Sequence, residues 1–141
     1  MTTADEVKKI RVGAVAGNRR RGGDVRITLS PKTVGSTSGF GGVLWLGRGE
    51  RVAEHYHPYS EEFVHVIDGE VELVVEDRSF ALGPGDSLMV PIGKRHRMHN
   101  HGEETARLVF HLSPLAPRPD LGHVDLEEPV SPSAAQPEVG A

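Results

Sequence analysis

Apolar and polar residues alternate in short runs along most of this chain. In residues 25–30 every second side chain is apolar, as in a strand with one buried face. Similar short runs predict strands at 9–12, 40–46, 51–57, 62–67, 70–76, 79–82, 87–90 and 106–112. The pattern therefore predicts about eight to ten short strands and no amphipathic helix, which is typical of a sandwich or closed barrel.

The segments between these runs contain residues that favour tight turns. The chain has 17 Gly and 10 Pro, and Asp68-Gly69 is a two-residue hairpin signal between two apolar runs. With 141 residues the chain is long enough for one domain with its own core. We expect a single all-β domain of antiparallel strands.

Composition excludes several classes of function. A formal net charge of −4 does not suggest a polyanionic partner. The basic loop at 18–24 is isolated and lacks aromatic residues, so we interpret it as a solvated turn that could also anchor an anionic ligand. No apolar run reaches the ~20 residues of a membrane helix. The first residues lack signal-peptide features, and cysteine is absent, so we expect a cytoplasmic protein without thiolate chemistry.

The chain divides into four parts by residue composition and predicted structure. Residues 1–8 form a polar tail, and residues 9–113 hold the predicted strands. From Pro114 onward prolines recur, so we expect residues 114–128 to wrap the domain surface as extended chain. Residues 129–141 are predicted to be a disordered, proline-rich tail.

Two motifs within the strand region carry the candidate chemistry. The first is Gly49-(x5)-His55-x-His57-(x4)-Glu62-(x6)-Gly69, and the second is Gly85-(x5)-Pro91-x-Gly93-(x2)-His96-(x3)-Asn100. Side chains at i and i+2 of a strand point to the same face, so His55 and His57 should project together. The turn before His96 can swing its side chain toward them. Imidazole nitrogens and a carboxylate oxygen suit Zn, Fe, Ni or Mn.

These motifs resemble those of the cupin superfamily, and all ten specified positions match. The resemblance covers about residues 40–113 and implies an antiparallel jelly-roll barrel with a metal at the inner end of its cavity. It also implies that His55, His57, Glu62 and His96 are the ligands. The six-residue gap to Gly69 selects Glu62 over Glu61 for this role.

Finer features resemble the small cupin cyclases of bacterial aromatic polyketide pathways, of the tetracenomycin and resistomycin type. They are the sequences at 55–63, 107–111 and 114–125. This resemblance implies an enzyme of antibiotic biosynthesis that guides ring closure and aromatisation of a poly-β-ketone chain. One divalent metal, with zinc favoured because no redox step is needed and Ni, Fe or Mn as alternatives, would act as a Lewis acid.

The general base is the open question among the remaining histidines. His65, His99 and His101 are expected to face outward or to be solvated. If Leu108, Phe110 and Leu112 face the cavity, His111 faces out and is inert; in the opposite register His111 enters the barrel. We favour the inward register by analogy with the cyclases. His111 would then be a general base, or an extra ligand that takes the place of Glu62.

Other functions remain compatible with the same residues. A cupin dioxygenase acting on an enol or catechol could use Fe or Ni on the same ligands. A non-catalytic small-molecule-binding cupin, or a chaperone-like protein that folds the nascent chain, is also open. As partners we expect the polyketide substrate, a polyketide synthase complex and a second copy in a homodimer, because a jelly roll leaves sheet edges to cover.

Overall fold

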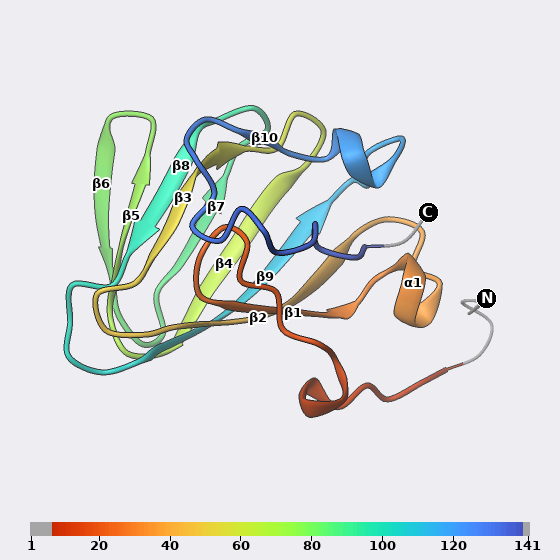
Figure 1. The fold of residues 1–141 in the computed structure, drawn as a ribbon, viewed down its shortest axis with the longest axis horizontal. Coiled ribbons are helices and arrows are strands. Elements are labelled where there is room, and N and C mark those ends of the chain that lie inside the picture. The colour runs from red at the N-terminus through yellow and green to blue at the C-terminus, as the bar shows by residue number, and fades with distance from the viewer. Residues whose placement is uncertain (1–6, 140–141) are drawn as a thin grey trace.

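The computed structural model describes residues 7–139, which form two five-stranded antiparallel sheets packed face to face (Figure 1). The first sheet has the order β1-β2-β9-β4-β7, with β1 Asp24–Leu29, β2 Phe40–Leu46, β9 Ala106–Ser113, β4 Glu61–Asp68 and β7 Ser87–Val90. The second has the order β10-β3-β8-β5-β6, with β10 Val124–Asp125, β3 Arg51–Tyr56, β8 His96–His99, β5 Val71–Val75 and β6 Arg78–Leu82. The predicted all-β jelly roll is confirmed.

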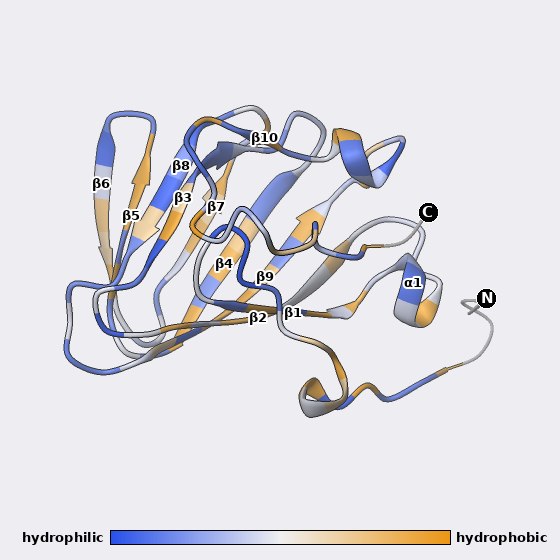
Figure 2. Cartoon of the chain, in the orientation of Figure 1, coloured by the Kyte–Doolittle hydropathy of each residue, from blue (hydrophilic) through white to orange (hydrophobic). Residues whose placement is uncertain are grey.

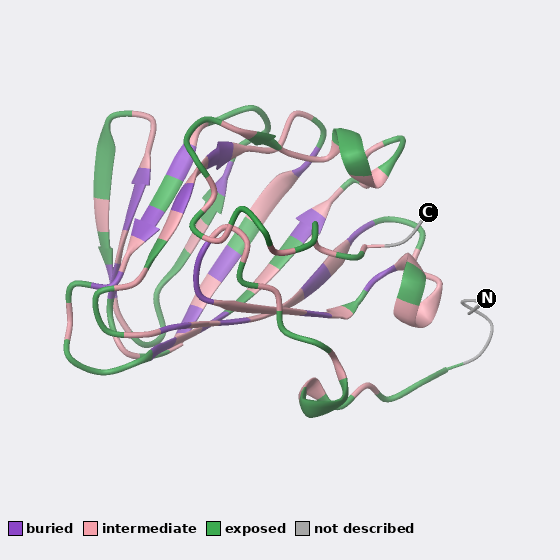
Figure 3. Cartoon of the chain, in the orientation of Figure 1, coloured by how far each residue is buried: buried purple, intermediate pink, exposed green. Residues whose placement is uncertain are grey.

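The core lies between the two sheets, where apolar side chains from both inner faces meet. Leu46 of β2 is completely buried, and Leu73 of β5 and Leu108 of β9 are each 1% exposed. Figures 2 and 3 show the alternation along the strands, in which buried and exposed residues succeed one another. The period-2 pattern of the sequence therefore indicated which face of each strand is buried.

The structure adds short helical turns that the apolar pattern did not indicate. The helix α1, Pro31–Val34, is a single turn, stabilised by a capping box in which Ser30 and Thr33 bond each other's backbone N–H. The 3-10 turns are η1, Val12–Ala14, and η2, Pro119–Leu121. The edge strand predicted at 9–12 is wrong, because the described strands start with β1 and Val12 begins η1 instead. No helix in the described part of the chain has the length and apolar character to cross a bilayer.

The chain after β9 runs back over the open end of the sandwich. Residues 124–125 form β10, which pairs with β3 and extends the second sheet. Residues 131–139 then lie across the front of the molecule beside the loop at 17–23, as Figure 1 shows. Arg20 of that loop donates hydrogen bonds to the backbone carbonyls of Pro132 and Ala134, while the disorder expected at 129–141 stays a prediction. Residues 1–6 of the predicted N-terminal tail, and residues 140–141, lie outside the described residues.

Candidate metal centre and its cavity

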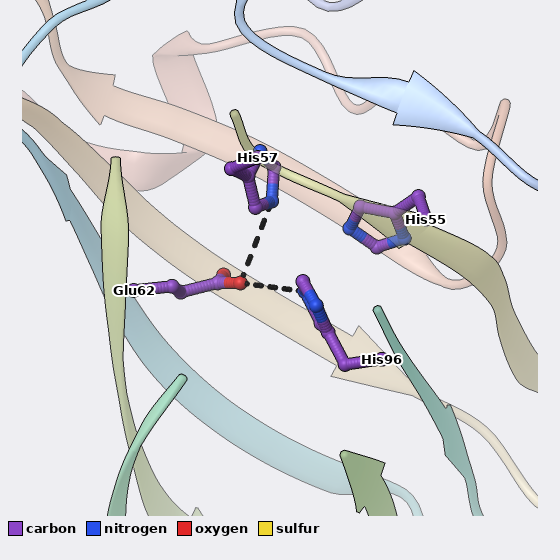
Figure 4. A group of neighbouring side chains, drawn as sticks. All are labelled: His55, His57, Glu62 and His96. Carbon is purple, nitrogen blue, oxygen red and sulfur yellow. Dashed lines mark hydrogen bonds and ion pairs between the residues drawn. The ribbon is translucent and has the colours of Figure 1, made fainter. Parts of the chain in front are cut away.

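Three histidines and one glutamate converge between the two sheets (Figure 4). In the second sheet, His55 of β3 is the direct cross-strand partner of His96 of β8. His57 follows two residues after His55, just past the end of β3, and its ring also turns inward. Glu62 comes from β4 of the opposite sheet. The site thus bridges the sandwich, with three imidazoles on one side and a carboxylate on the other.

The four side chains are close enough to bind one ion. One donor atom from each lies within 4.8 Å of the donor atoms of the others. Glu62 Oε1 is 3.0 Å from His96 Nε2 and 3.6 Å from His57 Nε2. His55 and His96 are buried, and the His57 and Glu62 side chains are 13% and 15% exposed. The spacing prediction that these four residues meet at one point agrees with this geometry.

Backbone carbonyls fix the orientation of all three imidazoles. His55 Nδ1 donates to the carbonyl of Ala53 at 2.7 Å, and His96 Nδ1 donates to that of Lys94 at 3.0 Å. His57 Nδ1 donates in the same way to Gly122 at 3.0 Å. A carbonyl oxygen can only accept, so each Nδ1 carries the proton and each neutral ring keeps a lone pair on Nε2. This is the arrangement by which proteins orient metal-binding histidines.

The short contact between His96 and Glu62 indicates whether a cation fits between these two side chains. With Nδ1 protonated, the neutral His96 ring would direct the Nε2 lone pair at a carboxylate oxygen 3.0 Å away. Two acceptors at this distance repel each other unless a proton or a metal ion lies between them. The donor set therefore fits a divalent cation, and imidazole with carboxylate suits zinc and its neighbours.

The pKa shifts at the cluster have the same origin. Burial lowers the pKa of His55 well below its usual value, and the neighbouring His96 and His57 lower it further. Burial also lowers the pKa of His96, but the hydrogen bond and charge of Glu62 outweigh it, so the net shift is upward. Burial raises the pKa of Glu62, yet its hydrogen bonds with His57 and His96 leave it far below the usual range. The cluster thus holds an ionised carboxylate that attracts positive charge.

A cavity of about 400 Å³ opens from this cluster. Its walls are mostly apolar and come from both sheets, with Leu44, Leu73 and Phe110 among the lining residues. Pro137 and Val139 of the C-terminal segment line it as well. A largely apolar cavity with a few convergent polar groups is typical of small-molecule sites.

The prediction that His111 faces inward is wrong. Phe110 and Leu112 of β9 line the cavity, so His111 between them points to the outer face, where it is exposed and its ring lies 6.5 Å from that of Phe63. The alternation of a regular strand decides this, since Leu108 and Leu112 are needed in the core. His111 is therefore excluded as a ligand or base within this cavity.

The motif residue Asn100 has a structural role. Its side-chain Nδ2 donates to the carbonyls of Leu46 and Glu104, and its Oδ1 accepts from the Gly102 N–H. Gly69 has a φ of +77°, and an added Cβ would lie 2.7 Å from Cα of Ala106. These motif positions shape the turns that bring the ligand-bearing strands together.

Two polar residues of the cavity were not among the sequence candidates. His123, after η2, lines the cavity, and so does Arg21 of the basic loop. Burial lowers the pKa of His123 to about 4, with the charge of Arg21 as the next contribution. No local pattern marks His123. Arg21 is followed by Gly22-Gly23, and this pair predicts a tight turn rather than a solvated loop.

Comparison with known proteins agrees with the fold and the motifs. The family model for the cupin domain matches residues 43–112. The polyketide synthase CurC of Streptomyces cyaneus is 55% identical over 120 residues, covering 85% of this chain and 78% of CurC. The tetracenomycin polyketide synthase protein TcmJ of Streptomyces glaucescens is 46% identical over 138 residues, covering 98% of this chain and 93% of TcmJ.

A solved structure shares the same architecture. The polyketide cyclase RemF of Streptomyces resistomycificus superposes with a TM-score of 0.68 at 17% identity, covering 90% of each chain. At that identity the likeness shows a common fold, whereas CurC and TcmJ match along most of their own length. The chain therefore belongs to the cupin family, in the group of small cupins that includes CurC and TcmJ.

Proposed function

We propose that this protein is a cyclase of aromatic polyketide biosynthesis, which promotes aldol-type ring closure and aromatisation of a poly-β-ketone and requires a metal. The observation that carries the proposal is the cluster of His55, His57, Glu62 and His96 in an apolar cavity, in a chain 55% and 46% identical to two polyketide synthase proteins. RemF, which has the same fold, is named a polyketide cyclase.

The four clustered residues would hold one divalent ion through the three Nε2 atoms and a Glu62 oxygen. The bound ion would supply Lewis acidity to a carbonyl oxygen of the substrate. Zinc is the first choice, because ring closure needs no redox step and zinc accepts this mixed nitrogen and oxygen set. The backbone carbonyls of Ala53, Lys94 and Gly122 keep the imidazoles in the required tautomer.

The remaining cavity residues contribute shape and exclusion of water. A linear poly-β-ketone has many carbonyls and acidic methylenes, so it can close several different rings in water. Apolar walls such as those from Leu44, Leu73 and Phe110 favour a folded chain and keep water from the reacting groups. With His111 on the outer face, any base that removes a methylene proton must be another cavity group or the substrate's own enolate.

The decisive experiment supplies the protein with a linear poly-β-ketone made by a reconstituted ketosynthase system. We expect the wild-type protein, loaded with zinc in metal-defined buffer, to raise the yield of one cyclised product. His96→Ala should lose bound metal and that gain. Full activity of metal-free His96→Ala would contradict the proposal and favour a chaperone-like role.

An oxygen electrode in the same assay separates the cyclase from a dioxygenase. The cyclase should consume no oxygen, because aldol closure and loss of water leave the oxidation level unchanged. Stoichiometric oxygen uptake with an enol or catechol would instead favour the dioxygenase. The homodimer and the contact with a synthase complex stay predictions, which light scattering and co-purification can test.

A further inference from the structure

Three consecutive arginines of the basic loop have three different environments. The Arg19 side chain is 60% exposed and pairs with Glu50 at 3.5 Å. Arg20 donates to backbone carbonyls of the C-terminal segment. The Arg21 side chain is only 11% exposed and lines the cavity. The loop is therefore not a uniform solvated cluster, and one of its cations lines the cavity. We call the part of the cavity lined by Arg21, His123, Pro137 and Val139 its mouth.

The glycines after Arg21 explain how its side chain reaches this position. Gly22 has a φ of +118°, and a Cβ there would overlap the carbonyl oxygen of Arg51. The carbonyl of Arg21 in turn accepts a hydrogen bond from Ala53 N–H at 2.7 Å. The loop is thus held tightly against β3, the strand that carries His55, which directs Arg21 toward the cavity.

Arg21 is ion-paired with Asp125, but its protein partners use only part of its guanidinium. Nε donates to Asp125 Oδ1 at 2.8 Å, while Nη2 makes a long hydrogen bond of 3.4 Å to Gln136 Oε1. Burial lowers the pKa of Arg21, although a guanidinium stays protonated under ordinary conditions. Among residues 7–139 these hydrogen bonds use Nε and Nη2, so Nη1 remains for a ligand. A mostly buried guanidinium with a spare donor can therefore bind one further oxygen acceptor beside Asp125.

His123 provides a second polar group in the same part of the cavity. It lines the cavity, where burial and the charges of Arg21 and His57 all lower its pKa. The preceding residue, Gly122, is the one whose carbonyl orients His57. His123 thus lies near both the cluster and Arg21. Its ring makes a hydrogen bond with Gln136, and its second nitrogen can donate or accept one more.

We propose that Arg21 and His123 form a second polar subsite, which binds an oxygen of an enolised β-dicarbonyl beside the four-residue cluster. The enolate of a 1,3-diketone shares one negative charge between two oxygens, so either oxygen is a strong acceptor for the remaining Nη1 donor of Arg21. The substrate class rests on the proposed function. By holding one dicarbonyl unit at the mouth, the subsite selects which carbonyl of a longer chain reaches the cluster.

The test measures binding of acetylacetone, a small enolisable 1,3-diketone, to the metal-loaded, full-length protein by calorimetry and by the ultraviolet spectrum of its enolate. Arg21→Gln should raise the dissociation constant about tenfold or more, the usual loss for a hydrogen bond to a charged group. His123→Asn should raise it about threefold. Arg19→Gln removes the same charge from the same loop outside the cavity and should leave the dissociation constant unchanged.

Two controls keep the result interpretable. Metal content and thermal unfolding, measured on each variant, show whether the cluster and fold are intact. Arg21→Lys keeps the charge without the planar fork and should weaken binding about threefold, which tests the subsite even if Arg21→Gln does not fold. Acetate as a competitor separates a β-dicarbonyl subsite from a general carboxylate site, because only the latter would be blocked at equal concentration.

Wild-type affinity in both Arg21→Gln and Arg21→Lys, or full competition by acetate, would overturn the subsite. These outcomes differ from failure of the proposed function. If acetylacetone binding depends on Arg21 but the wild-type protein cyclises no poly-β-ketone, the subsite stands and the cyclase is wrong. If the wild-type protein cyclises the poly-β-ketone, Arg21→Gln should shift the ratio of ring isomers. If neither this ratio nor acetylacetone binding changes in Arg21→Gln, the subsite is wrong and the cyclase proposal stands.

Discussion

The closed end of the cavity and its mouth are built in different ways. At the closed end, His55 and His96 face each other on adjacent strands, and their environment follows from strand pairing. At the mouth, Arg21, His123 and the segment 131–139 are distant in the chain, and Arg21 pairs with Asp125 of β10 at a separation of 104 positions. Regular strand pairing holds the first set, whereas side-chain hydrogen bonds and isolated backbone hydrogen bonds, such as that from Ala53 N–H to the Arg21 carbonyl, hold the second.

Under the proposed function, the cluster would carry the chemistry and the mouth would select the substrate. The cluster has a rigid backbone on both sides of the sandwich, as a metal site needs for constant geometry. The mouth has less regular backbone pairing, and Pro137 and Val139 line it from a segment without regular secondary structure. We therefore expect changes at the closed end to abolish activity and changes at the mouth to alter substrate choice.

The largest expected effect comes from removing a ligand at the closed end. His55→Ala should weaken metal affinity by more than about a hundredfold, since even the supporting residues of metal sites contribute 10–100-fold. His111→Ala, on the outer face, is the matched control and should keep the wild-type metal content. Metal analysis after dialysis measures both. A His55→Ala protein with full metal content would contradict the prediction that metal binding depends on this cluster.

The next effect concerns the backbone of the mouth. Gly22→Ala should destabilise the fold by about 2–3 kcal/mol, because positive φ and overlap with the Arg51 carbonyl act together. Gly49→Ala is the control: Gly49 also has positive φ, at +75°, but a Cβ would meet nothing within 4 Å. Its cost should be about 1 kcal/mol. If Gly22→Ala and Gly49→Ala lose the same unfolding free energy in urea, the close approach of Gly22 to β3 does not contribute to stability.

A pH-dependent effect should distinguish the mouth histidine. The pKa of His123 is about 4 in the folded chain against an ordinary 6.5. The unfolded chain therefore binds this proton first, so the contribution to stability is complete above about pH 6.5 and is lost as pH falls toward 4. Between pH 7 and 4, metal-free wild type should lose more unfolding free energy than metal-free His123→Asn. Parallel pH profiles would contradict a desolvated His123.

The smallest effect is expected from the C-terminal segment. Truncation after residue 130 removes the hydrogen bonds from Arg20 to Pro132 and Ala134, which are partly solvent-exposed, so stability should fall by only about 1 kcal/mol. The association rate of acetylacetone should rise in stopped-flow measurements because Pro137 and Val139 no longer cover the cavity. An unchanged association rate would mean that the segment does not restrict entry.

The sequence was most informative where spacing and strand parity act locally. His55 and His57 share a face because two residues separate them, and the glycines that bound the motifs mark turns that the structure contains. His111 was misplaced because analogy was preferred to parity, although the apolar pattern of Leu108, Phe110 and Leu112 favoured the outward register. His123 was missed because nothing near it in the chain indicates a cavity.

The resemblance of its two motifs to those of cupins implied the four residues of the candidate metal centre, and the amino-acid sequence by itself determined the all-β fold and the shared face of His55 and His57. These depend on a two-residue period and on turn residues, which act over a few positions. Only the tertiary structure decided that Arg21 and His123 meet at the cavity mouth and that residues 131–139 cover it. Those contacts join distant segments through single side chains and isolated backbone hydrogen bonds, and no periodic pattern records a contact of that kind.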